Sequence, residues 1–89
     1  MIELIWDEAF IRIMKKWRKK HPGLMKIFKD RIILFSKNPY HPLLKTHSLS
    51  GKLSEYWAIS ITYKYRLVFK FLSQNKVLLI DIGTHDEVY

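Results

Sequence analysis

The segment YWAISITYKYRLVFKFLSQNKVLLIDI, from Tyr56 to Ile82, decides the fold of this chain. Within it, large apolar residues recur at every second position, which is the period of a strand with one buried face. The polar segments 62–64 and 73–76 divide it into three runs. We therefore predict an antiparallel meander of three strands, with the last strand, 77–82, at the centre of the sheet. The residues predicted to face the core are Trp57, Ile59, Ile61, Leu67, Phe69 and Phe71.

Two amphipathic helices are predicted upstream of the meander. Asp7 is a suitable N-cap for the first helix, and His21-Pro22-Gly23 ends it because proline cannot continue a helix interior. A second helical pattern runs from Leu24 to Phe35 and stops at Asn38-Pro39. The apolar face of the first helix is formed by residues at helical spacing, namely Phe10, Ile13, Met14 and Trp17.

The remaining segments complete an α+β prediction. The short apolar run 2–6 is typical of a strand that pairs with the later meander. Residues 38–54 show no period and are expected to form a long ordered loop, and loops of this length are often functional. Residues 83–89 are expected to form a short polar tail. The order β-α-α-β-β-β predicts one domain, residues 1–89, in which a helical hairpin packs on one face of an antiparallel sheet in two layers.

Two compositional features limit the class of protein. The chain has no cysteine, which excludes a disulfide framework, a thiolate metal site and a cysteine nucleophile, and which suits a reducing cytoplasm. Its first residues lack the basic segment and apolar core of a signal peptide. Its longest apolar stretches fall far short of the ~20 residues that span a bilayer. We expect a soluble cytoplasmic protein with no membrane partner.

The charge balance indicates what kind of partner the chain attracts. Sixteen Lys and Arg residues against eight Asp and Glu residues give a net charge of +8 and a pI of about 9.8. Such a field favours encounter with a polyanion, most often nucleic acid. An acidic protein partner would use the same field, and a basic surface that serves only solubility is the third interpretation.

Known cofactor motifs are absent from the sequence. It contains no Walker loop, no dinucleotide-binding glycine pattern and no HExxH. Its four histidines lack the tight spacing of a zinc site. They are His21, His41, His47 and His85. We therefore expect no metal and no cofactor, so that any catalysis must use side chains alone.

Metal-free cleavage of RNA needs a base for the 2′-hydroxyl proton, a cation for the charge that grows on phosphorus, and an acid for the departing 5′-oxygen. Histidine serves as base or acid near neutral pH, and arginine offers a planar cation to phosphate oxygens. An aromatic ring holds an unpaired base by stacking. The sequence offers candidates for these roles in and around the meander, namely His47, Arg66, His85 and Tyr89. Each of them, taken alone, is more often a surface, capping or terminal residue.

Short segments of the C-terminal half resemble the RelE/ParE toxin superfamily, nearest its YafQ, YoeB and RelE branches. The matching stretches are His47–Gly51, Leu53–Trp57, Ile61–Thr62, Tyr65–Phe69 and Ile82–Tyr89. The N-terminal strand and helices match the superfamily in order only. The resemblance implies a RelE-like fold and the toxin of a type II toxin–antitoxin pair. Such a toxin is an endoribonuclease (an mRNA interferase) that cleaves mRNA in the ribosomal A site and that a cognate antitoxin inhibits.

By position, the resemblance also assigns roles to individual residues. Arg66 matches the arginine that holds the scissile phosphate. His47 and His85 match catalytic positions of the family, and Tyr89 matches its terminal aromatic residue. YafQ-like toxins carry His and Asp where this chain has Ser60 and Lys64, so the pattern combines two branches. We assign His47 as the base and His85 as the acid, and the opposite assignment, with His85 as the base and His47 as the acid, stays open. The expected contacts to RNA are Lys45, Lys52, Lys64 and Lys70.

Two other functions fit parts of the sequence. A ParE-like inhibitor of DNA gyrase would use the same scaffold without nuclease chemistry, and it would need neither the imidazole pair nor the terminal His-plus-aromatic motif. A non-catalytic nucleic-acid-binding module would depend on the basic stretch 15–20, and loss of His85 would leave it unaffected.

Overall fold

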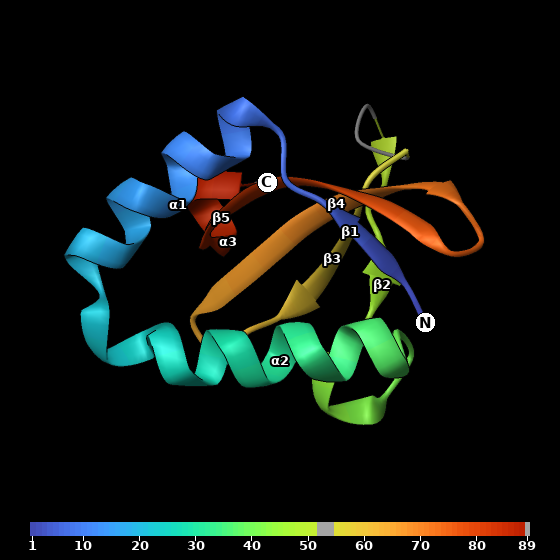
Figure 1. Ribbon diagram of the computed structural model, residues 1–89, viewed down its shortest axis with the longest axis horizontal. Helices are drawn as coiled ribbons and strands as arrows, with labels where there is room; N and C mark the ends of the chain where they lie inside the picture. The colour runs from blue at the N-terminus through green and yellow to red at the C-terminus, as the bar shows by residue number, and fades with distance from the viewer. Residues whose placement is uncertain (52–54, 89) are drawn as a thin grey trace.

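The computed structural model describes residues 1–51 and 55–88, and within them two long helices cover one face of a five-stranded sheet (Figure 1). In chain order the helices and strands are β1 (Glu3–Ile5), α1 (Glu8–Lys20), α2 (Met25–Lys37), β2 (His47–Ser48), β3 (Trp57–Ser60), β4 (Tyr65–Ser73), β5 (Lys76–Thr84) and α3 (His85–Val88). Short 3₁₀ helices lie at Pro22–Leu24 and Pro42–Leu44.

The strands follow the order β1-β5-β4-β3-β2 across the sheet. β1 runs parallel to β5, and the other neighbouring pairs are antiparallel. The predicted α+β class with two layers is confirmed, and the predicted meander corresponds to β3, β4 and β5. The last strand of the meander, β5, was predicted at the centre of the sheet; it is an interior strand, between β1 and β4, while β4 takes the middle position.

The first helix begins and ends where the sequence predicts. The Asp7 Oδ1 atom accepts a hydrogen bond of 2.8 Å from the backbone N–H of Phe10, which satisfies a donor that the first helical turn leaves unpaired. Glu8 lies in the first turn and three basic residues lie in the last turn, and both arrangements suit the helix dipole. At the other end, the N–H of His21 donates to the carbonyl of Trp17, and Pro22 follows.

The main core lies between the helices and the sheet. Phe10 of α1 and Phe35 of α2 are fully buried against this face, and the Phe35 and Phe69 rings meet edge to face with centroids 4.8 Å apart. The predicted inward residues all lie here, with Ile59, Ile61, Leu67 and Phe69 buried and Trp57 and Phe71 half-buried. The two helices meet at one corner and diverge from it along the sheet (Figure 1).

Two segments differ from the sequence-based expectation. Within residues 38–51, expected as loop, His47 and Ser48 form β2, which pairs with Ala58 and Trp57 of β3. A strand of two residues is too short to produce a readable period, so the pattern could not show it. Residues 83 and 84, expected in a polar tail, complete β5 instead.

The rest of the expected tail forms α3, which a reciprocal cap holds at the end of β5. The backbone N–H of Thr84 donates to Glu87 Oε1 at 2.8 Å, and the backbone N–H of Glu87 donates to Thr84 Oγ1 at 3.3 Å. This capping box fixes the start of the helix. Gly83 makes the close approach possible, because a Cβ atom there would lie 3.1 Å from both Glu87 Cβ and Val88 Cγ1.

Candidate functional site

His47 and Arg66, two of the predicted site residues, lie on the side of the sheet that faces away from α1 and α2, which we call the distal face. Its centre is a small apolar cluster, formed by Leu49, Ala58 and Val68, against which Val88 of α3 packs. Side chains alternate along a strand, so Arg66, between the core residues Tyr65 and Leu67, also projects to the distal face.

The strand register places His47 and Arg66 on this same face. His47 pairs with Ala58, and Ala58 pairs with Val68, the distal-face neighbour of Arg66 in β4. Paired residues in an antiparallel sheet project to the same side. From strand spacing, the two Cα atoms are separated by roughly 10 Å across the sheet and roughly 7 Å along it. Two long side chains at this separation can contact one ligand that lies between them.

The Arg66 guanidinium is turned toward the β3–β4 connection. Its Nη1 atom donates to the carbonyls of Thr62 at 3.0 Å, Tyr63 at 2.8 Å and Tyr65 at 3.5 Å. These bonds hold the tip of the hairpin and fix the orientation of the planar group. Within the described residues, Nε and Nη2 donate to no other group, so they remain as a charged donor pair for an anion.

The His47 ring is fixed in one tautomer by its backbone neighbour. Its Nδ1 atom lies 2.9 Å from the carbonyl oxygen of Lys45, and a carbonyl oxygen can only accept a hydrogen bond. The proton therefore resides on Nδ1, and in the neutral ring the lone pair that can take up another proton is on Nε2. The side chain is exposed on the short edge strand β2.

His85 is placed by α3 at the end of β5 that lies beside Arg66. Gly83 pairs directly with Arg66, and His85 follows two residues later as the first residue of the helix. Its Nδ1 atom lies 3.6 Å from Asp86 Oδ1, and the ring is 69% exposed. A carboxylate at this distance pairs with the protonated imidazolium, although the exposure keeps the attraction weak.

The lysines predicted to contact RNA differ in whether they already interact with other side chains of the protein. Lys70 Nζ lies 3.2 Å from Glu55 Oε2, so this charge is partly neutralised. Lys64 lies over the Tyr65 ring, with Nζ 5.7 Å from the centroid. Lys45 is exposed and adopts a left-handed backbone conformation with φ of 49°. Lys52 and Tyr89, also predicted as site residues, lie outside the described residues.

One acidic residue of the distal face was not anticipated as part of the site. Asp81 of β5 pairs with Val68, and its Oδ1 atom accepts a hydrogen bond of 2.8 Å from the N–H of Ile82. Burial raises the pKa of Asp81 above its ordinary value, the hydrogen bond from Ile82 lowers it, and the neighbouring Glu87 raises it. The only sequence signal is a single acid inside an otherwise apolar strand, which period counting overlooks.

Comparison of the sequence with protein-family models and with curated proteins finds no match. Solved structures do match, beginning with YafQ from E. coli strain BL21(DE3), at a TM-score of 0.80 and 20% identity, covering 100% of this chain and 99% of YafQ. The YoeB/ParE toxin from Agrobacterium tumefaciens has a TM-score of 0.72 and 22% identity, covering 94% and 99%. A chain of the E. coli DinJ–YafQ toxin–antitoxin complex has a TM-score of 0.71 and 18% identity, covering 99% and 97%. The chain has the fold of the RelE/ParE toxins.

Within this toxin fold, the predicted site residues fall into a central group and a rim. His47 and Arg66 project to the distal face, and α3 begins at His85, two residues after the Gly83 that pairs with Arg66. Lys45 and Lys64 each lie two residues before a site residue, His47 and Arg66 respectively, and Lys70 projects to the same face as Arg66. Within residues 1–51 and 55–88, no cluster of three or more His, Asp or Glu side chains has the geometry to hold a metal ion, and no helix is long and apolar enough to cross a bilayer.

Proposed function

We propose that this protein is the toxin of a type II toxin–antitoxin pair and that it cleaves mRNA without a metal ion. The observation that carries the proposal is the register, which directs His47 and Arg66 to one face of the sheet with His85 at its end. The RelE/ParE toxin fold is independent support for this proposal, since the chain shares that fold with toxins over almost its whole length.

In the proposed reaction the 2′-hydroxyl oxygen of one nucleotide attacks the adjacent phosphorus. Nε2 of His47 takes the hydroxyl proton, a role that its tautomer supports. Nε and Nη2 of Arg66 stabilise the additional negative charge on the phosphorane oxygens. His85, in its imidazolium form, gives its proton to the 5′-oxygen as the phosphorus–oxygen bond breaks. The products are a 2′,3′-cyclic phosphate and a free 5′-hydroxyl, so atoms and protons balance.

The charge of the protein suits a polyanionic substrate bound outside the molecule. With a net charge of +8, the chain attracts RNA before any specific contact forms. Lys45 and Lys64, two residues before His47 and Arg66 in the chain, are proposed to contact phosphates on either side of the scissile bond. The proposed setting is the cytoplasm, with mRNA presented as a single strand in the ribosomal A site.

An antitoxin is the proposed regulatory partner. The DinJ–YafQ structure, which shares this fold, is a toxin–antitoxin complex. An inhibitor of this protein must cover the distal face or displace α3, because these features hold the proposed catalytic groups.

The test is primer extension on cellular mRNA after induction of the protein, which reveals new 5′ ends. Wild type should produce new ends, and His85→Ala should produce at least about 10²-fold fewer, since positioned acids contribute about 10²–10⁴ in rate. The matched control is His41→Ala, which removes a histidine whose Nδ1 accepts from the N–H of Leu43 within a short 3₁₀ helix. Unchanged cleavage by His85→Ala, at normal folding, would show that His85 is not the acid.

One observation favours the gyrase-inhibitor alternative. Nη1 of Arg66 already binds three turn carbonyls, which is also what a purely structural arginine would do. If induction leaves mRNA intact while DNA breaks accumulate, the nuclease proposal is wrong and the inhibitor interpretation replaces it.

A further inference from the structure

A small pocket lies at the edge of the sheet where β4 begins and β5 ends. Tyr65 and Ile82, which line it, belong to the main core, so the pocket is on the helix side and not on the distal face. Its volume is about 160 Å³. Pockets for drug-sized ligands measure about 300–1,000 Å³, so this one suits a small ion.

The wall of this pocket contains a buried donor that has no acceptor. Trp17 lines the pocket and is 6% exposed, and within residues 1–51 and 55–88 its indole Nε1–H reaches no hydrogen-bond partner. The rings of His21, Tyr65 and Phe28 surround it, with centroids 5.4, 5.5 and 5.9 Å away. A buried N–H without an acceptor is rare in native proteins and costs free energy, so this donor indicates an acceptor that enters the pocket from solvent.

His21 and Tyr65 add a second donor to the wall. The Tyr65 hydroxyl oxygen lies 3.1 Å from His21 Nε2, and both residues line the pocket. If the hydroxyl donates, the neutral ring carries its proton on Nδ1, and if Nε2–H donates, the hydroxyl proton is left over. In both arrangements the pair keeps one polar hydrogen that this bond does not use.

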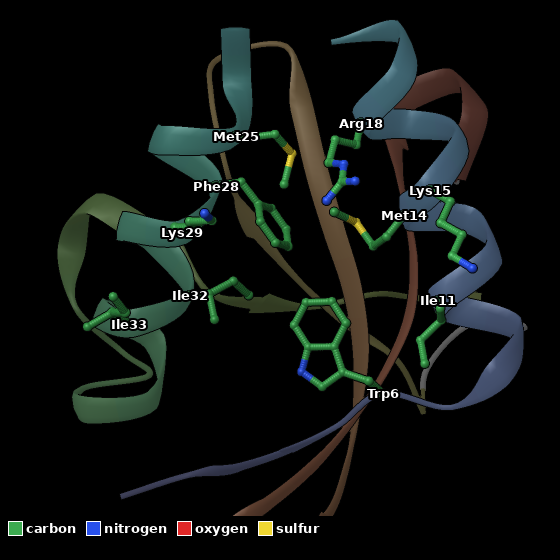
Figure 2. Close-up of a pocket in the computed structure, with 10 residues that line it drawn as sticks. All are labelled: Trp6, Ile11, Met14, Lys15, Arg18, Met25, Phe28, Lys29, Ile32 and Ile33. Atoms are coloured by element: carbon green, nitrogen blue, oxygen red, sulfur yellow. The ribbon is translucent and has the colours of Figure 1, made fainter. Parts of the chain in front are cut away.

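Two lysines supply positive charge at the rim of the pocket. Lys16 and Lys20 lie one turn apart on α1, and both line it. Neither forms an ion pair with a carboxylate of the described part of the chain. Their neighbours Lys15 and Arg18 line the larger apolar groove between α1 and α2 instead, and Figure 2 shows the Arg18 side chain turned into that groove. The charges of α1 are thus divided between two hollows.

We propose that the small pocket binds the phosphate group of a small anion, either inorganic phosphate or a terminal phosphate whose remainder extends into solvent. The Trp17 indole N–H and the remaining hydrogen of the His21–Tyr65 pair donate to its oxygens. Lys16 and Lys20 pair with its charge. Hydrogen bonds to an ionised acceptor are about twice as strong as neutral ones, so phosphate satisfies the buried donor better than water does. Such a site does not depend on the proposed nuclease activity.

Glu87 couples the pocket to α3. Its side chain also lines the pocket, and its Oε1 atom accepts the hydrogen bond from the Thr84 N–H that fixes the start of α3. Hydrogen bonds from Thr84 lower the pKa of Glu87, and the charges of Lys20 and His21 add smaller contributions of the same sign. A bound anion pairs with the same cations and repels the carboxylate, so phosphate binding and the α3 cap weaken each other.

Titration of the full chain with inorganic phosphate, followed by NMR, tests the site. The indole N–H signal of Trp17, identified by its loss in Trp17→Phe, should shift saturably with a dissociation constant of about 1 mM or lower at constant ionic strength. Absence of a saturable shift up to about 10 mM would overturn the proposal. Tighter binding of acetate than of phosphate would overturn the assignment of the ligand.

A nucleoside monophosphate separates the two sources of the phosphate group. If it binds at least about tenfold more tightly than inorganic phosphate, the ligand is a terminal phosphate of a larger molecule. Equal or weaker binding identifies inorganic phosphate as the ligand.

Variants of α1 locate the bound anion through the backbone amide signals, which all of them retain. Trp17→Phe keeps an aromatic ring but removes the donor, and it should weaken binding by about tenfold or more. Lys16→Gln with Lys20→Gln should also weaken it by about tenfold. Lys15→Gln with Lys19→Gln removes the same charge outside the pocket and should change binding less than about twofold. Equal weakening by both lysine pairs would show only general attraction to a basic protein and would overturn the site.

Glu87→Gln tests the coupling to α3. Removal of the like charge should tighten phosphate binding by about two- to fivefold, and saturating phosphate should lower the protection of the α3 amides in wild type. Unchanged affinity in Glu87→Gln would overturn the coupling. Phosphate binding by a protein that cleaves no RNA would support the site and reject only the nuclease.

Discussion

Substitution of Gly83 by alanine tests whether the seating of α3 places a catalytic group. The added Cβ atom would lie 3.1 Å from Glu87 Cβ and from Val88 Cγ1, closer than the optimum of about 3.5–4.0 Å for carbon atoms. Overpacking of this kind costs about 1–3 kcal/mol when nothing yields. Here α3 is four residues long and is held by one capping box and one apolar side chain, so it is the element that gives way.

The expected result is a loss of activity that exceeds the loss of stability. If α3 lifts from β5 and so relieves the strain, the loss of stability stays below about 1 kcal/mol, and Tm should fall by less than about 8 °C, because 1 kcal/mol corresponds to about 4–8 °C in a domain of this size. Cleavage should fall by about 10²-fold or more, since His85 moves with the helix. Gly23→Ala is the matched control, because a Cβ at Gly23 meets nothing within 4 Å. Full cleavage by Gly83→Ala, measured on a synthetic RNA bound to ribosomes, would refute the link between α3 seating and His85.

Two further predictions concern the helix caps. Asp7→Ala removes the acceptor for the Phe10 N–H and should cost about 0.5–2 kcal/mol, measured by urea denaturation, while Glu8→Ala, which makes no such bond, should cost less. The second concerns pH, because hydrogen bonds from the Thr84 backbone and side chain lower the pKa of Glu87 below its ordinary value of 4.5, with smaller contributions from Lys20 and His21. The ionised carboxylate is the form that the folded state binds, so its contribution is complete above pH 4.5 and is lost as the pH falls through the lowered pKa. The protection of the α3 amides against exchange, relative to their intrinsic rates at each pH, should fall over that acidic range in wild type, and Glu87→Gln should show no such step because its side chain does not ionise; a wild-type helix equally protected at both ends of the range would contradict this.

The main elements were predictable because their periods are long enough to read. Helix α1 has an apolar stripe, a capping Asp7 and a stop at Pro22, and each of these follows from local chemistry. The meander was readable because large apolar residues such as Leu67, Phe69 and Phe71 recur at every second position along the strand. The α3 cap was also readable, since Thr84 and Glu87 have the spacing of a capping box, but a four-residue helix after a strand resembles a polar tail.

The arrangement of the candidate site was only partly predictable. Each of His47, Arg66 and His85 was identifiable as a residue suited to the chemistry, and the roles of all three remain proposals. Local sequence patterns do not reveal the register between strands. The pairing of His47 with Ala58 directs the His47 side chain to the distal face. The divergence of α1 and α2 (Figure 1) is set by packing on the sheet and leaves no trace in either helix alone.

The parallel pairing of β1 with β5 has a consequence for how the chain acquires its structure. Glu3 pairs with Lys76, so the first strand finds its partner only after nearly the whole chain has been made. Contacts between such distant residues slow folding, and synthesis proceeds from the N-terminus. Until β5 is available, α1 and α2 hold an apolar face with no complete sheet to cover it. His85 follows β5 directly, as the first residue of α3, so under the proposed function a nascent chain lacks its catalytic acid until the segment after β5 has been synthesised.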